Sequence, residues 1–233
     1  MRTFFGIKPN EVILFLICLL VYVAIVFIWN LSGIASSNMS FIKDNAPAVI
    51  SDLPPQSISK LVVTSSLYLM ALAYALVSVA MSPYRERLPQ IAGIGVLTFV
   101  AWVALNYWVI AGFLNSSIWY GVAAVVLLLV WGGGVMRFVA RLHDPMALFL
   151  VRFGLGLSLF ITIVQIATVL YDVVASLLPV LPIFEWRSPL NGVPILYTLT
   201  FNAMVGAFLA GAGGNMLWRE RRELALASGR KKR

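Results

Sequence analysis

The chain has 233 residues, of which 61% are hydrophobic and only 11% are charged. Soluble domains usually carry about 25% charged residues, so this composition excludes an ordinary water-soluble domain. Uninterrupted apolar runs of about 18 residues or more are long enough to cross a hydrocarbon core of about 30 Å as helices. A membrane β-barrel would instead show alternating residues. We therefore predict an all-α membrane bundle, and the single Cys18 excludes an intrachain disulfide.

The basic residues are concentrated at a few places along the chain. Most of the 17 Lys and Arg lie at the N-terminus, in two short internal clusters or in the C-terminal tail. Alternation of basic and non-basic connections between apolar runs is the positive-inside pattern. It predicts six spans in a plasma or inner membrane, with both termini in the cytoplasm. The basic residues at these places are Arg2, Lys8, Arg85, Arg87, Arg137, Arg141, Arg152, Arg219, Arg221, Arg222, Arg230, Lys231, Lys232 and Arg233.

The predicted spans form a single domain, residues 1–233, and prolines mark several of their boundaries. Pro83 ends the second span, and Pro89 suits the first turn of the third. Asp144-Pro145 is typical of an N-cap followed by the first residue of a helix. A cleaved signal peptide is the alternative interpretation of the first apolar run. The helices are expected at about 12–30, 61–81, 90–113, 118–136, 146–173 and 195–218, with an interfacial or re-entrant segment at 176–194 and a basic tail at 219–233.

The fifth predicted helix carries a polar stripe. Its small and polar residues recur every three or four positions, which places them on one helical face of roughly 120°. A polar face in hydrocarbon needs partners, so it should line a solute path or a seam between helices. The plainer alternative is hydrogen bonding between helices, or from Ser and Thr to their own backbone. The stripe consists of Gly154, Ser158, Thr162, Gln165, Thr168 and Asp172.

The sixth predicted helix carries small residues at a spacing of four, in the pairs Gly206/Ala210, Ala207/Gly211 and Ala210/Gly214. Such pairs let helix backbones approach closely, because association in lipid depends on packing. We expect this surface to pack on the fifth helix or on a partner subunit. Asn202 shares the face with Gly206 and Ala210. Asn106 of the third helix either bridges helices or lines a cavity.

Catalytic signatures are missing from the sequence. It has no GxSxG, P-loop or HExxH motif. His143 is the only histidine, which excludes a haem with two axial imidazoles within this chain. We therefore expect no enzyme activity, no metal and no cofactor. The basic residues sit at membrane exits, so the anionic cytoplasmic leaflet is the expected partner and nucleic acid is not.

Two functional hypotheses follow. The first is a non-catalytic integral membrane subunit of a larger complex, which docks through small-residue helix faces. It depends on the missing catalytic motifs and on the abundance of packing motifs. The alternative is a small-solute or ion permease, in which Ser158, Thr162, Gln165 and Asp172 face Asn202 and Asn106 across a cavity.

Overall fold

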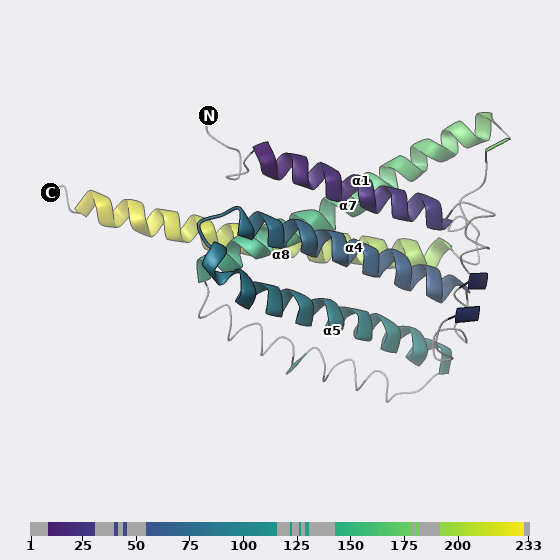
Figure 1. Ribbon diagram of the computed structural model, residues 1–233, viewed down its shortest axis with the longest axis horizontal. Helices are drawn as coiled ribbons and strands as arrows, with labels where there is room; N and C mark the ends of the chain where they lie inside the picture. Colours follow the sequence, from purple (N-terminus) through teal and green to yellow (C-terminus); the bar gives the residue numbers. More distant parts are fainter. Residues whose placement is uncertain are drawn as a thin grey trace. The chain divides into compact units, whose positions relative to one another are not determined.

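The computed structural model shows a helical protein (Figure 1). Within the described residues, all regular secondary structure is helical, with one 3-10 turn among the α-helices. The elements are α1 Pro9–Asn30, α4 Pro55–Ala80, η2 Arg85–Arg87, α5 Leu88–Asn115, α7 His143–Leu177 and α8 Gly192–Arg230. The described residues are 9–30, 40–41, 44–45, 55–115, 122, 126, 129–130, 143–178, 180–181 and 192–230.

Five of the six predicted helices have counterparts among these elements. Three of them, α1, α4 and α7, are long and apolar enough to cross a membrane. The fourth predicted helix, 118–136, lies outside the described residues except for four isolated positions, and most of the predicted segment 176–194 lies outside them as well. The four positions are Val122, Val126, Leu129 and Val130, each helical and exposed.

The helices extend beyond the apolar runs that predicted them. α4 begins at Pro55 and α8 begins just before Pro194, because proline is tolerated in a first turn that needs no N–H donor. α7 begins at His143, so Asp144 and Pro145 belong to its first turn and do not precede the helix. α8 was expected to end at Trp218 but continues to Arg230, since Glu, Leu, Ala and Arg favour helix whether or not they are apolar.

The chain divides into two compact units, and three helices contribute to both. The first unit comprises residues 1–70 and 157–204, and the second comprises 71–156 and 205–233. The prediction of a single domain stays a prediction, because this division does not test it.

In the first unit, aromatic side chains join α1 to α7. Phe160 is fully buried, and its ring centroid lies 4.9 Å from that of Phe15 and 6.3 Å from that of Tyr22. Farther along both helices, Phe27 meets Tyr171 edge-on at 5.7 Å. The contacts advance in the same direction on both helices, so α1 and α7 run parallel (Figure 1). Aromatic pairs at these separations are attractive and fill large volumes.

α1 buries one face and exposes the rest. Cys18, Tyr22 and Val26 are buried, while Ile17 and Leu20 on other faces are more than half exposed. Its mean hydropathy over the candidate span is the highest of the three, 3.2. A helix that is apolar on all sides but packed on only one face is suited to hydrocarbon rather than to water.

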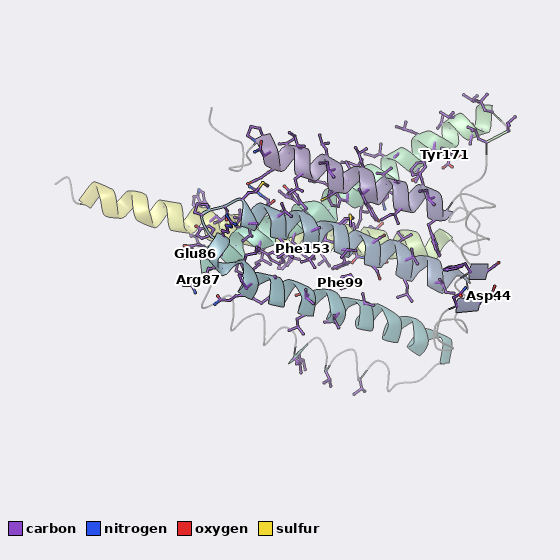
Figure 2. All side chains as sticks on the ribbon, in the orientation of Figure 1. Asp44, Glu86, Arg87, Phe99, Phe153 and Tyr171 are labelled. Carbon is purple, nitrogen blue, oxygen red and sulfur yellow. The ribbon has the colours of Figure 1, made fainter. Side chains whose placement is uncertain are left out.

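In the second unit, a short turn joins α4 to α5. The Ser82 hydroxyl donates to the Val79 carbonyl at 2.6 Å and accepts the N–H of Tyr84 at 3.1 Å. The N–H of Arg87 donates to the carbonyl of Tyr84 at 2.9 Å. These bonds satisfy backbone groups where α4 stops, so the basic turn predicted from the sequence is present (Figure 2 marks Arg87 at this turn).

We predict that Phe160→Ala lowers the free energy of unfolding in detergent micelles by about 3 kcal/mol, because it removes a buried aromatic ring and leaves a cavity. Leu170→Ala on the same helix is the control, since Leu170 is 62% exposed. Equal losses for the two variants would show that α7 does not pack on α1 through Phe160.

Candidate functional site

In the second unit, α7 and α8 approach each other closely at Gly154 of α7. A Cβ atom built on Gly154 would clash with the carbonyl oxygen of Gly206 and lie 2.5 Å from the backbone nitrogen of Ala210, both in α8. No real Cβ atom tolerates such contacts with backbone, which cannot rotate away as a flexible side chain can. Only glycine therefore allows α7 and α8 to meet here, and the structure brings together Gly154, Gly206 and Ala210 of the two predicted surfaces.

A second glycine, Gly213, continues the same contact. Its Cβ position lies 2.7 Å from the carbonyl oxygen of Ala147 and 3.0 Å from the backbone nitrogen of Val151. Because Ala147 and Val151 precede Gly154 while Gly213 follows Gly206, α7 and α8 run antiparallel. At this level of α8, Gly213 is the glycine that contacts α7.

Gly214 and Gly211 do not take part in this contact. Among the described residues, a Cβ atom on either glycine would meet nothing within 4 Å. The sequence assigned both to a packing surface because they stand four residues from Ala210 and Ala207. Spacing alone cannot tell which neighbouring glycine faces the partner helix.

α7 is also close to α4, and α4 to α5. The Cβ position of Gly156 lies 3.1 Å from the Cβ of Ala71, and that of Gly95 lies 2.6 Å from Cδ1 of Leu72. Gly154 and Gly156 are two positions apart, so they point to different faces of α7, one toward α8 and the other toward α4. The sequence search missed Gly156 and Gly95 because it sought small residues spaced by four. The Gly-x-Gly sequence of α7 was the feature from which a second close contact of this helix could have been predicted.

Arg152 lies within this closely packed stretch of α7. It is 1% exposed and is the largest of the fully buried side chains. Phe149, one turn before it, stacks on Phe153 at 5.6 Å. The sequence pattern predicted Arg152 at the edge of a span. The structure instead buries it, because α7 begins at His143 and packing starts before the uncharged run. Arg152 is engaged in an interaction there, as is the buried Glu11 of the first unit.

The predicted polar stripe of α7 is divided between exposed and buried positions. Thr162 is exposed, and its hydroxyl donates to the Ser158 carbonyl at 2.8 Å. Thr168 is buried, and its hydroxyl donates to the Gln165 carbonyl at 2.8 Å. Ser158, Gln165 and Asp172 are partly exposed. Both threonines thus bond to their own helix, as the plainer interpretation of the stripe expects.

Asn202 forms a long-range polar contact in the first unit. It is fully buried, and its Oδ1 accepts a hydrogen bond from the Tyr68 hydroxyl of α4 at 3.1 Å. Thr64, one turn before Tyr68, is also buried. Sequence reasoning missed Tyr68 because a tyrosine inside an apolar run gives no polar signal. Asn106 belongs to α5, but its side chain lies outside the described part of the structure.

α8 has a second face that the described part of the chain leaves uncovered. Ala207, Phe208, Gly211 and Asn215 are all exposed, at helical spacings of one, three and four. The side chain of Phe208 is 75% exposed. We call these four residues the α8 open face. It contains the predicted small-residue pair Ala207/Gly211 and one polar side chain, so it has the composition of a helix-docking surface.

No candidate metal site or family relationship adds to this geometry. Among the described residues, no group of three or more His, Cys, Asp and Glu could hold a metal ion. No protein-family model, curated protein or solved structure matches the chain. The candidate site is therefore the pair of α8 surfaces, one closed by α7 and the other open.

We predict that Gly154→Ala lowers the free energy of unfolding by about 1–3 kcal/mol, because the added methyl forces α7 and α8 apart. Gly211→Ala should leave it unchanged or raise it by up to about 1 kcal/mol, since alanine favours helix and has room. Both variants are unfolded from the same mixed micelles. An equal effect at the two positions would contradict the close approach at Gly154.

We predict that Tyr68 and Asn202 are energetically coupled. A double-mutant cycle of Tyr68→Phe and Asn202→Ala should give a coupling free energy of about 0.6 kcal/mol, the average for hydrogen bonds between membrane helices, and no more than about 1.7 kcal/mol. The measurement is unfolding of the two single variants and the double variant. Additive losses would show that the hydrogen bond is not formed.

Proposed function

We propose that the chain is a non-catalytic integral membrane subunit that docks a helix of another membrane protein on the α8 open face. In this proposal it crosses a plasma or inner membrane six times and keeps both termini in the cytoplasm. The basic residues near its cytoplasmic ends contact the anionic leaflet.

The helix directions support the proposed topology. In a chain that crosses a membrane six times, the first and fifth spans run one way and the sixth runs the other. α1 and α7 are parallel, and α7 and α8 are antiparallel, as this order requires. The positions of the basic residues support the cytoplasmic assignment of the termini.

The observation that carries the docking proposal is the contrast between two glycines. The space at Gly154 is filled by the backbone of α8, whereas a Cβ on Gly211 would meet nothing within 4 Å. Within the described residues, the fold thus uses Gly206 and Ala210 and leaves Ala207 and Gly211 uncovered. Small residues contribute to helix association in lipid only when another backbone approaches them. An open small-residue face therefore fits a second helix better than it fits lipid.

Asn215 gives independent support, because it is an exposed polar side chain on the same face. Polar groups on membrane helices usually find partners on neighbouring helices. An asparagine beside Gly211 can hydrogen-bond a docked helix while the glycine lets that helix approach. The partner is therefore a membrane helix that presents a small residue at the depth of Gly211 and a polar group at the depth of Asn215.

The permease alternative has less support. It needs the polar stripe of α7 to face a path, but Thr162 is exposed and both threonines bond to their own helix. Asn202, which was expected to face that stripe, accepts a hydrogen bond from Tyr68 of α4. Two side chains of the stripe thus bond locally, and we favour the subunit.

We predict that Gly211→Leu removes the chain from its native complex without unfolding it. A leucine has room in the isolated chain but blocks a docked helix. Gly93→Leu is the matched control, because Gly93 is also exposed, is also helical and also has nothing within 4 Å of its Cβ position.

The measurement is the apparent size of each tagged variant, extracted from native membranes in mild detergent and separated on a native gel. Wild type and Gly93→Leu should migrate in a larger assembly, and Gly211→Leu as the free chain. A wild-type protein that migrates as a monomer would contradict the proposal, and so would a Gly211→Leu variant that keeps its assembly.

A further inference from the structure

Two exposed arginines and a tryptophan lie on one side of α8, beyond the α8 open face. Trp218 is 59% exposed, and the guanidinium carbon of Arg222 lies 5.5 Å from the centre of its ring. Arg219 and Arg222 are both exposed. At 3.6 residues per turn, the three side chains span about 100° of the helix surface, with Arg222 between the other two. The two guanidinium groups therefore project from the same side of the helix.

The contacts between α8 and α7 place Trp218 at one end of the candidate span of α7. The Cβ position of Gly213 contacts Ala147 and Val151, and the two helices are antiparallel. Trp218 follows Gly213 by about 7.5 Å along the helix axis, and Asp144 precedes the midpoint of the α7 contact by about the same distance. Trp218 is therefore level with Asp144, where that span begins. A tryptophan beside charged groups is typical of the boundary between hydrocarbon and headgroups.

The two arginines form an anion-binding pair. Among the described residues, no carboxylate is paired with either Arg219 or Arg222. The two are three positions apart, so their positive charges are neighbours on the helix surface and repel each other. An anion that bonds both groups offsets this repulsion. Arginine binds phosphate through two parallel N–H···O bonds, and the headgroup phosphates of anionic lipids lie at this depth of a bilayer.

The turn η2, also in the second unit, carries two exposed arginines in a different arrangement. Arg85 and Arg87 are two positions apart in a 3-10 turn, which has three residues per turn. Their side chains therefore leave the turn about 120° apart, compared with about 60° for Arg219 and Arg222. The arginines of η2 add positive charge to the second unit, but they do not project to one side as the α8 pair does.

We propose that Arg219 and Arg222 together bind the phosphate of one anionic phospholipid. The inference rests on the proposed membrane position of the chain, and it is narrower than a general attraction to the anionic leaflet. It assigns one site to one lipid, and it requires a phosphate whose charge is not neutralised by an amine of the same headgroup. Arg222 lies about 10 Å beyond Asn215 along the helix axis, so the bound phosphate leaves the α8 open face uncovered.

The first test measures binding of phosphatidylglycerol with a fluorescent tail to the purified full chain in uncharged detergent micelles. The phosphate is the only charged group of this lipid, so its binding reports recognition of phosphate. We expect saturable binding of one lipid per chain. Phosphatidylcholine with the same tail should bind about tenfold more weakly, because its choline group neutralises the phosphate. Equal affinity for the two lipids, or no binding of phosphatidylglycerol to the wild type, would overturn the proposal.

The second test removes the arginine pair. Arg219→Gln with Arg222→Gln should weaken the binding of phosphatidylglycerol about tenfold, which corresponds to about 1.4 kcal/mol. Arg85→Gln with Arg87→Gln is the matched control. It removes the same charge from two exposed residues of the second unit, and should leave the affinity unchanged. Equal weakening by the two pairs would show attraction by total charge alone, which is incompatible with the proposed site.

Competition distinguishes a lipid site from a site for a soluble anion. Unlabelled phosphatidylglycerol should displace the labelled lipid from the wild type, whereas inorganic phosphate in the same buffer should not, because it gains nothing from the micelle. If inorganic phosphate displaces the labelled lipid as effectively as unlabelled phosphatidylglycerol does, the assignment to a lipid is wrong.

The lipid site and the docking on the α8 open face can fail separately, because the lipid is added to the isolated chain. If phosphatidylglycerol fails to bind but Gly211→Leu still releases the chain from its complex, only the lipid site is wrong. If the lipid binds with the expected selectivity and Gly211→Leu keeps its assembly, the lipid site stands and the proposed docking face is wrong.

Discussion

The packing of the second unit depends on the close approach of α7 and α8 at Gly154. Here one backbone nearly touches another, and no side chain lies between them. A hydrocarbon environment gives little hydrophobic force between helices, so dense packing and short backbone contacts must hold them together. The same segment of α7 also meets α4 at Gly156. Glycine thus sets the separation of α7 from two neighbouring helices, and the side chains around it fill the space that remains.

In the first unit, large side chains hold the helices together. Phe160 fills the space between α7 and α1 against two aromatic rings. The hydrogen bond from Tyr68 to Asn202 joins α4 to α8. The bond is directional and fixes the rotation of the two helices, whereas aromatic contacts tolerate sliding. Among the described residues, the unit therefore combines a broad apolar contact with a specific hydrogen bond.

These contacts change how α8 is understood. Its small residues looked like one surface in the sequence, but they occupy two faces with different surroundings. Gly206, Ala210 and Gly213 support the chain's own fold. The α8 open face is exposed among the described residues, and we propose that a partner helix docks there. One helix thereby takes part in internal packing and in the proposed docking in the membrane.

Much of the helical organisation could be predicted from the sequence, because apolar run length and the spacing of charges are local properties of a membrane helix. Five predicted helices, the basic turn before Pro89 and the small-residue surfaces of α8 were all derived in this way. Helix ends were less accurate, since hydropathy marks where a chain can enter lipid and not where helical hydrogen bonding stops. For this reason the extension to Arg230 was missed.

Tertiary structure alone decided which residues meet. Small residues surround α8 on several sides, so periodicity could not distinguish Gly213 from Gly214, or the closed face from the open one. Arg152 likewise looked like a boundary residue and proved to be buried. The helical periodicity of the sequence gives the direction in which each side chain points from the axis of its own helix. The positions of the other helices determine whether that direction holds a backbone, a side chain or open space.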